Sequence, residues 1–522
     1  MTADVDSRAP SRPFNLIISA ETAERVLFWV SVAGAAGMMW LAPRLPMLDL
    51  PQHAAQIALW RDLLMGTSRW SHLVYINLLT PYLIGYGLAL PFAVLFSAET
   101  AVRIVLTMAF LGFVAGCIGL RREIGSDKRL DWLFLPGFFG FDWKLGFLTF
   151  LAAAPVLFGL LILALRYARA PTVAKGCGLV VAGIALLFSH GLVFLFGMLI
   201  VGLLLLGPLK ERWESRLARL APVIVLTAIL VLFAIVTSDR GTAAHYDHWR
   251  MGVPIWLRPV AALIFISGST WNLDPLLAGL AAVAMLTPFF IGPRANRGAP
   301  RILMFALVFV FFALPSEAFQ TGFLFHRFAL FILPFFAFQF RTPEFAAPHN
   351  GANAPARFTM IAACLATLAI QGSRIWVFGQ ESRSFNRIEQ AARPGKRALG
   401  IVFDGNSPGA SNKVVYDHFP LWYQADHHGF VDFNFAAFHP QIVRFRPNEI
   451  PTVGQQFVAR FKAFDWQKDH AWIYRYFFIR GSASRVDWLK ARSPCKLSLV
   501  AADAPWFLVR RDSCPAGSHT PS

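Results

Sequence analysis

Charged side chains are scarce in this chain of 522 residues. Asp, Glu, Lys and Arg make up only 15% of it, while 56% of the residues are hydrophobic and 14% are aromatic. An ordinary soluble domain has about 25% charged residues. The composition therefore excludes a water-soluble globule, and we expect a polytopic α-helical membrane protein.

Acidic residues are scarcer than basic ones, with 30 Asp and Glu against 48 Lys and Arg, a formal charge of +18. Such an excess also occurs in nucleic-acid-binding proteins, but here Lys and Arg gather in short loops between apolar runs, the positive-inside pattern. The loops assigned to the inside hold 19 of them and the outer loops 7. We therefore expect membrane lipids and no nucleic acid as partners.

Cysteines are few, and the chain has only five. Cys117, Cys177 and Cys364 lie in apolar runs, where a buried free thiol is the ordinary interpretation. Only Cys495 and Cys514 lie in a polar region. An oxidising compartment would permit these two to form a disulfide, but the sequence leaves that bond open.

Apolar runs long enough to span a bilayer, which takes roughly 20 residues, recur through residues 26–378. Residues 1–25 form a cytoplasmic tail. The shortest predicted span, 130–142, would cross only with the help of its flanks. We predict about 11 transmembrane helices: 26–46, 101–120, 130–142, 145–165, 175–190, 191–208, 219–237, 273–292, 302–318, 323–340 and 357–378.

This topology depends on the outward segment 43–97. Its apolar part, 73–97, contains Pro81, Gly85 and Pro91, so we expect it to lie along the outer interface without crossing. If it crossed, the charged loop 121–129 would face outward.

The composition changes from about residue 379, where long apolar runs stop. Short strand-like segments and flanking helical patterns predict a soluble α/β domain at 379–522. In a bacterial inner membrane with the N-terminus cytoplasmic, this domain is periplasmic. The predicted strands are 398–404, 472–480, 497–501 and 506–510, and the predicted helices are 381–393 and 484–492.

Ionisable residues recur on the outer side of the predicted membrane. Asp49 and His53 follow the first span and are four residues apart, so a helix starting at Pro51 would let them converge. Burying a charge at bilayer depth costs roughly 2.5–3.5 kcal/mol, which makes a functional site the default interpretation. The other members at this level are Asp142, Lys144, His190, His245, Asp247, His248, Glu317, His326 and Arg327.

Several of these residues also have a structural explanation. Asp142 and Lys144 could anchor the interface beside Trp143, and His190 could be a hydrogen-bonded core histidine. Asp49 could cap a helix. Arg327 lies in a run of Phe and Leu, where binding an anionic lipid headgroup is its most economical use.

Three short stretches stand out in this layout: Asp49-Leu50-Pro51-Gln52-His53, Phe141-Asp142-Trp143, and His326-Arg327-Phe328 leading to Leu333-Pro334. With the order of spans and outward loops, they resemble the GT-C superfamily of integral membrane glycosyltransferases. The outward interfacial segment and the C-terminal soluble domain also belong to that architecture. The resemblance implies sugar transfer from a polyprenyl-phosphate donor to a glycan, lipid or protein acceptor on the outer face.

On this match Asp49, with His53, is the catalytic group, because an acceptor hydroxyl must lose a proton as the glycosidic bond forms. The departing phosphate needs charge stabilisation, and His326 and Arg327, with Lys144, would supply it.

Asp142 and His190 would position the acceptor or a cation. The family's usual first loop carries Asp-Glu or Glu-Asp, whereas Leu50 follows Asp49 here. A divalent cation could be held by Asp49 and Asp142, but these residues predict no particular ion.

Two other classes of function remain open. A transporter or flippase would place ionisable residues near the mid-bilayer and often show repeated halves, and no duplication is visible. A non-catalytic envelope-assembly protein would not need Asp49. The aromatic and polar stretch 416–428 could form a sugar-binding surface, while His427-His428 lacks zinc-motif spacing.

Overall fold

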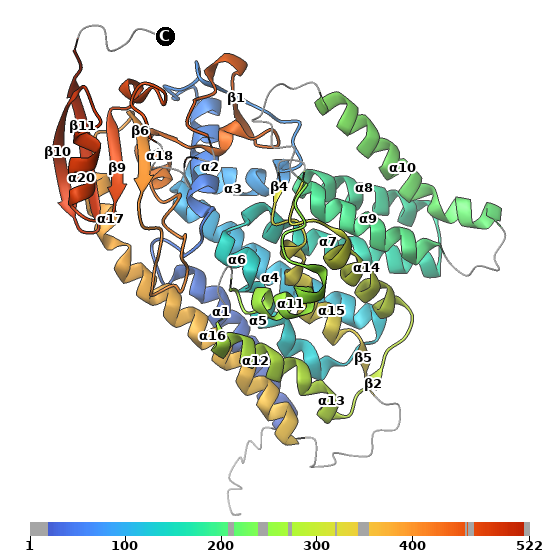
Figure 1. Ribbon diagram of the computed structural model, residues 1–522. Helices are drawn as coiled ribbons and strands as arrows, with labels where there is room; N and C mark the ends of the chain where they lie inside the picture. The colour runs from blue at the N-terminus through green and yellow to red at the C-terminus, as the bar shows by residue number, and fades with distance from the viewer. Residues whose placement is uncertain are drawn as a thin grey trace, which may run out of the picture.

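The computed structural model describes residues 19–206, 213–238, 249–269, 274–318, 321–342, 354–454, 457 and 464–515. His245, Asp247 and His248 lie outside these ranges. A bundle of helices makes up most of the described chain, and a sheet of C-terminal strands lies at one end of it (Figure 1).

The first half of the chain is almost entirely helical. Ser19 and Ser97 cap α1 and α4 by accepting the N–H groups of Thr22 and Thr100. The elements are α1 (Ala20–Gly37), η1 (Met38–Trp40), α2 (Leu50–Leu64), β1 (Val74–Ile76), α3 (Leu83–Leu95), α4 (Ala98–Ile124), η2 (Lys128–Leu133), α5 (Phe134–Phe138), α6 (Phe141–Leu145), α7 (Leu148–Arg169), α8 (Val173–Ser189), α9 (Gly191–Leu205) and α10 (Trp213–Ser238).

Shorter helices and two small strand pairs follow, before one long helix leads to the C-terminal part. β2 pairs with β5 and β3 with β4, both antiparallel. The elements are η3 (Ile255–Leu257), α11 (Arg258–Ile266), α12 (Pro275–Leu286), α13 (Pro288–Ile291), β2 (Arg294–Ala295), α14 (Ala299–Ala313), β3 (Glu317–Ala318), β4 (Thr321–Gly322), η4 (His326–Phe331), α15 (Ile332–Ala337), β5 (Phe340–Arg341) and α16 (Ala354–Glu381).

Four helices, α4, α7, α10 and α16, are long and apolar enough to cross a membrane by length and composition. Several other predicted spans are broken into shorter apolar helices, so the count of eleven stays a prediction. Prolines explain two breaks. Pro288 has no backbone N–H to donate to the carbonyl of Ala284, which accepts the Thr287 hydroxyl at 3.0 Å instead. Pro334 lies in the first turn of α15.

Further differences from the predicted elements are local. In place of one span, residues 130–142 contain most of η2, all of α5 and the start of α6, and the helix α11 was not predicted. α16 continues to Glu381, so the boundary predicted at 379 falls inside its last turn.

The C-terminal part contains a five-stranded sheet in the order β10-β11-β9-β6-β7. β6 is parallel to β7 and β9, and the other pairs are antiparallel. Cys495 and Cys514 form a disulfide. The elements are α17 (Arg383–Gln390), β6 (Arg397–Val402), α18 (Leu421–His427), β7 (Phe430–Asp432), η6 (Phe435–Ala437), β8 (Val443–Phe445), η7 (Pro447–Glu449), η9 (Ala471–Ile473), β9 (Tyr476–Arg480), α20 (Ser484–Lys490), β10 (Lys496–Asp503) and β11 (Trp506–Ser513).

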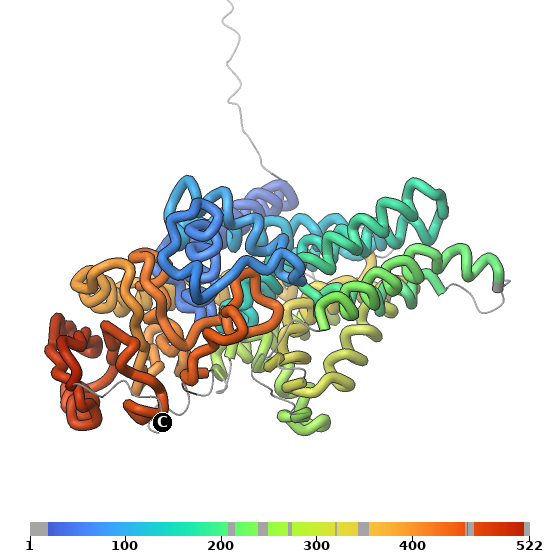
Figure 2. The backbone as a smooth tube through the Cα atoms, turned by 90° about the horizontal axis from the view of Figure 1, so that it is seen from above, coloured from blue at the N-terminus to red at the C-terminus, as the bar shows by residue number. Residues whose placement is uncertain are grey.

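The first loop packs on this C-terminal part. α2 contacts α18, and β1 pairs with β8, with Val74 opposite Phe445. The buried Gln52 side chain accepts the N–H of Phe435 at 2.9 Å and donates to the carbonyl of Phe433 at 3.1 Å. Two regions far apart in sequence therefore form one packed unit, as the blue and orange segments in Figure 2 show.

The segment 73–97 begins and ends beside this unit. Its helix α3 has 13 residues, about 20 Å at 1.5 Å per residue, which is less than the roughly 30 Å of a bilayer core. One end of the segment is β1. Near the other, the carbonyl of Ala93 accepts Arg61 Nη1 of α2 at 3.2 Å.

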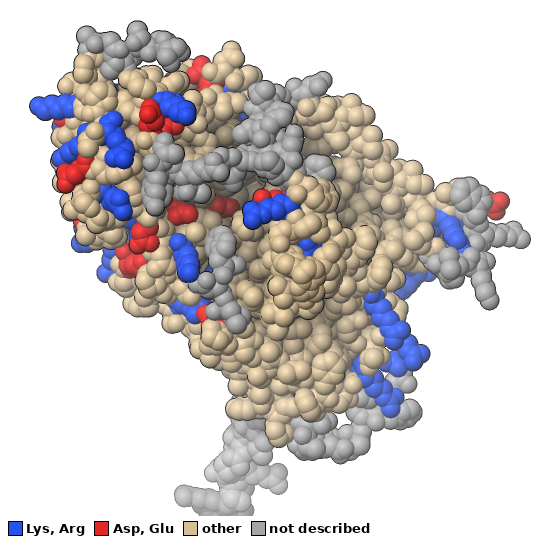
Figure 3. Space-filling model, in the orientation of Figure 1, with Lys and Arg blue, Asp and Glu red and all other residues tan. Residues whose placement is uncertain are grey.

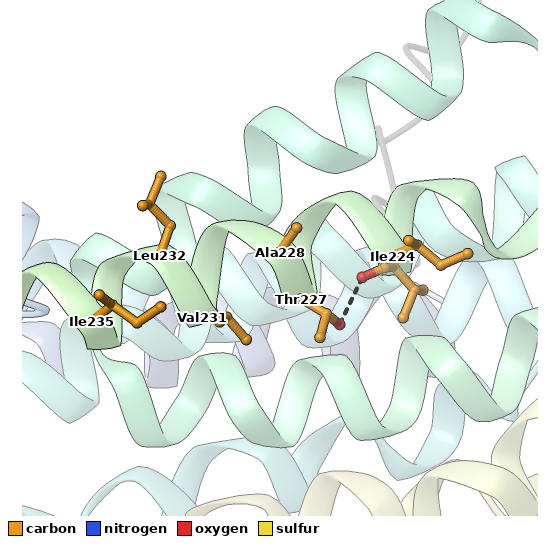
Figure 4. Close-up of a pocket in the computed structure, with 7 residues that line it drawn as sticks. Ile224, Thr227, Ala228, Val231, Leu232 and Ile235 are labelled. Atoms are coloured by element: carbon orange, nitrogen blue, oxygen red, sulfur yellow. Dashed lines mark hydrogen bonds between the residues drawn. The ribbon is translucent and has the colours of Figure 1, made fainter.

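Exposed apolar side chains cover much of the helical part. Charged residues gather over the C-terminal sheet and at the opposite lower edge, while few lie on the helical surface between them (Figure 3). On α10, Leu232 is 62% exposed and Ile235 64%. Together with Ile224, Thr227, Ala228 and Val231 they line a shallow apolar groove of 530 Å³ (Figure 4). Soluble monomers rarely expose such surfaces, whereas lipid tails would cover them.

Candidate active site

The turn between α6 and α7 holds the loop that carries Asp49. The N–H groups of Leu48 and Asp49 donate to the carbonyls of Lys144 and Leu145 at 3.2 and 2.9 Å. Gly146 has φ +80°, and a Cβ there would lie 2.9 Å from the nitrogen of Leu50. This close approach requires glycine, and it places the first-loop Asp beside α6.

Asp49 occupies the N-cap position of α2, but its side chain makes no capping bond. Its Oδ1 lies 3.5 Å from Nε2 of His418. The C-terminal part thus places an imidazole on this carboxylate.

The electrostatics of this pair follow from burial. Burial raises the pKa of the Asp49 carboxyl to about 7, against the opposing charge of Arg327. Burial also lowers the pKa of His418 to about 4, so the imidazole is neutral near pH 7. Nδ1 of His418 lies 3.4 Å from the amide nitrogen of Gln52, a donor. We therefore assign the His418 proton to Nε2, facing Asp49.

His53 has a different partner. Its Nδ1 lies 2.7 Å from the hydroxyl of Tyr86, which donates its proton to Gln441 Oε1 at 2.7 Å. Because that hydroxyl has only one proton, His53 Nδ1 must be the donor to its oxygen. Although Asp49 and His53 are four residues apart, they do not pair with each other. His53 contacts Tyr86, and Asp49 contacts His418.

Arg327 lies in the same region. Its guanidinium covers the ring of Phe147 at 3.8 Å, and Nη2 donates to the carbonyl of Gly322 at 3.1 Å. It interacts electrostatically with the carboxyl groups of Asp142 and Asp49, and the phenol of Tyr82 lies in the same group. Its Nε is buried without a hydrogen-bond partner among the described residues.

Asp142 and His190 are buried beside this arginine with their polar atoms unpaired. Neither oxygen of Asp142 and neither ring nitrogen of His190 has a hydrogen-bond partner within the described part of the chain. His190 packs against Tyr82 and Phe150, with ring centroids 5.1 and 5.2 Å away. An unpaired buried polar group costs about 1–3 kcal/mol, so several together point to a bound polar molecule.

His326 and Lys144 are placed differently. His326 stacks on Phe325 at 3.9 Å and lies against Phe141 at 5.4 Å, with Nδ1 buried and unpaired in the described structure. Lys144 Nζ donates to the carbonyl of Ser411 at 3.0 Å. Lys144 therefore anchors the C-terminal segment, while Asp49, Asp142, His190 and Arg327 gather in one cluster.

The sequence did not single out His418, Tyr82 or Tyr86 as site residues. His418 lies in the stretch 416–428, whose mixture of aromatic and polar side chains was the only signal. Tyr82 and Tyr86 lie in the interfacial segment, where tyrosine is common for other reasons.

Among the described residues, Asp49 and Asp142 have no third ligand that would complete a metal site. Within the ranges that the structure describes, no three His, Cys, Asp or Glu side chains come together in a group that could hold a metal ion. Asp49 and Asp142 are such residues, but no further one completes a group with them.

Two crystal structures of ArnT from Cupriavidus metallidurans have the same fold as this chain. The structure bound to undecaprenyl phosphate has a TM-score of 0.55 and 13% identity, and the match covers 96% of this chain and 100% of that one. The apo structure has a TM-score of 0.53 and 15% identity, with 97% and 100% covered. No protein-family model and no curated protein sequence matches the chain.

The likeness to ArnT concerns the fold. It agrees with the predicted layout, in which a largely helical part is followed by a C-terminal part that contains a sheet.

Proposed function

We propose that this protein is a membrane glycosyltransferase that moves a sugar from a polyprenyl-phosphate donor to an envelope glycan, lipid or protein acceptor. The observation that carries the proposal is the buried cluster of unpaired polar atoms on Asp142, His190 and Arg327, adjacent to Asp49. The ArnT structure bound to undecaprenyl phosphate supports it, since that protein shares the fold.

The site lies where the first loop meets the C-terminal part. We place this face in the periplasm and the N-terminus in the cytoplasm of a bacterial inner membrane, because the basic loops gather at the other end. A lipid-linked donor suits such a site, since its phosphate lies at headgroup level and its chain in the bilayer.

Arg327 is the residue suited to the donor phosphate. As the sugar leaves, negative charge grows on the phosphate oxygens, and a guanidinium already in place stabilises that charge without reorganisation. Its contact with Phe147 fixes the plane of the guanidinium. Nε is free to donate to a ligand.

Asp49 is suited to take the acceptor's proton. A carboxylate whose pKa is about 7 is a stronger base than an ordinary aspartate and still ionises near neutral pH. The neutral His418 packs beside this carboxylate, with Nε2 3.5 Å from Oδ1, and helps to shield it from water. Asp142 and His190 remain to bind sugar or acceptor hydroxyls.

The experiment that tests donor binding is titration of the purified, detergent-solubilised protein with undecaprenyl phosphate. Removing one charged hydrogen-bond partner costs about 1.5–3 kcal/mol, so we expect Arg327→Gln to raise Kd at least about tenfold. The exposed Arg383→Gln is the matched control and should bind like the wild type. An unchanged Kd for Arg327→Gln would remove the phosphate role.

A further inference from the structure

A polar cavity lies at the end of the bundle opposite the C-terminal sheet. It has a volume of 330 Å³ and lies between α1, α4, η2 and the first turn of α16. At about 30 Å³ per water molecule, it has room for about ten waters. Its charged lining residues are Glu21, Glu24, Arg25, Arg121, Arg122, Lys128, Asp131 and Arg357.

α16 fixes the distance between this cavity and the C-terminal sheet. Arg357 lines the cavity, while Glu381, the last residue of α16, lies 3.8 Å from Arg480 of the C-terminal sheet. The 24 steps between them span about 36 Å, more than a bilayer core of roughly 30 Å. Figure 1 shows α16 running along this length. The cavity therefore lies at the other membrane surface.

The cavity has more positive than negative charge. Three of its cations have close partners: Arg121 Nε lies 2.8 Å from Asp131, Lys128 Nζ 2.5 Å from Glu21, and Arg357 Nη2 2.7 Å from Glu24. These pairs account for all three acids of the lining.

The two remaining cations are not neutralised. Arg25 lies 3.8 Å from Glu21, which Lys128 already holds. The side chain of Arg122 makes no hydrogen bond or ion pair in the described ranges; its charge acts on Asp131, which Arg121 already holds. The lining thus has room and charge for one anionic group.

The wall of the cavity continues into surface that faces lipid. Phe28, Trp29 and Ile118 line its apolar side, and Trp29 is 50% exposed. The neighbouring positions Val26 and Val30 of α1 are 56% and 61% exposed. An occupant with a phosphate head and acyl chains would satisfy both parts, whereas a soluble phosphate would use only the first. Basic pockets between helices at the cytoplasmic surface bind anionic lipid headgroups in this way.

We infer that this cavity is a binding site for the headgroup of an anionic phospholipid, with Arg25 and Arg122 holding its phosphate and α1 its chains. The inference needs a membrane around the helices but not the transferase activity. It therefore stands or falls separately from the proposed function.

Native mass spectrometry of the full-length protein in detergent tests this site, with phosphatidylglycerol and phosphatidylcholine as probes. We expect phosphatidylglycerol to bind preferentially, and Arg25→Gln/Arg122→Gln to weaken its binding about twenty-five-fold. That is about fivefold for each charge, equivalent to about 1 kcal/mol each. Arg301→Gln removes an exposed arginine outside the cavity and should have no effect.

Three results would overturn the inference. One is wild-type affinity of the double variant for phosphatidylglycerol, and another is equal binding of the two lipids to the wild type. The third is displacement of phosphatidylglycerol by glycerol phosphate at equal concentration, which would identify a soluble phosphate as the ligand. Thermal unfolding of each variant in phosphatidylcholine alone shows whether it is folded.

Discussion

Single residues decide the chemistry proposed for this protein, and the pair of Asp49 and His418 is the least expected of them. Asp49 was visible in the sequence because an acid directly after an apolar span is costly. His418 was not, since it is far along the chain and reaches Asp49 only when the C-terminal part docks on α2. No local pattern encodes such a contact.

Asp142, His190 and Arg327 were predicted as site candidates for the same energetic reason. The structure brings these three side chains together, and each has buried polar atoms without a partner in the described residues. The sequence suggested the residues but could not show that they lie together. The same reasoning predicted Lys144 as a phosphate-binding residue. In the structure its ammonium group donates to the backbone carbonyl of Ser411.

The raised pKa of Asp49 predicts a pH profile. The carboxyl accepts a proton only when ionised, so sugar transfer should increase as pH rises, with kcat/KM half-maximal near pH 7. His418, with its pKa lowered to about 4, is neutral above pH 5, so its titration does not change kcat/KM in that pH range. Transfer to endogenous acceptor in membrane vesicles measures the profile.

His418→Ala should move that limb to lower pH by a unit or more, because water then reaches Asp49 and its pKa falls toward the ordinary value. The exposed His72→Ala is the control and should keep the wild-type profile. A His418→Ala limb at the wild-type position would show that His418 does not shield Asp49.

Helices and turns place these residues, and the turn at Gly146 is the one that holds the loop of Asp49. The sequence predicted the helices on either side because apolar runs and caps are local signals. It also predicted four of the five sheet strands. It missed the breaks at Pro288 and Pro334, where a single apolar run hides two short helices.

Gly146→Ala should lower both activity and thermal stability. Alanine at φ +80° is strained, and its Cβ would lie 3.0 Å from the nitrogen of Asp49. We expect a loss of about 1–3 kcal/mol and a displaced carboxylate. Gly87→Ala, in α3 with nothing within 4 Å of its Cβ, is the control. Thermal unfolding and transfer rate check both, and wild-type behaviour of Gly146→Ala would contradict the close approach.

At the scale of the whole molecule, the sequence predicted a membrane part and a C-terminal α/β domain from the change in composition near residue 379. It could not show that the first loop and the C-terminal part form one packed unit, since β1 and β8 pair across more than 360 residues. The site lies at that junction, and the lipid cavity at the other end of the bundle.

Reporter fusions test the orientation of this arrangement. An enzyme active only outside the cytoplasm, fused after residue 97, should be active, because that position lies beside α2 and the C-terminal part. The same reporter after residue 125 should be inactive, since α4 carries the chain to the opposite surface. Activity at 125 would put the basic loop outside and break the proposed topology.

The central claim is that Asp49 supports sugar transfer in the cell envelope. Mass spectrometry of envelope glycans, from a deletion strain complemented with wild type, Asp49→Asn or the exposed Asp487→Asn, tests it most directly. General base catalysis contributes about 10²–10⁴-fold. We predict that Asp49→Asn, at wild-type protein level, loses the sugar that wild type and Asp487→Asn add. Normal glycans from the Asp49→Asn strain would contradict the claim.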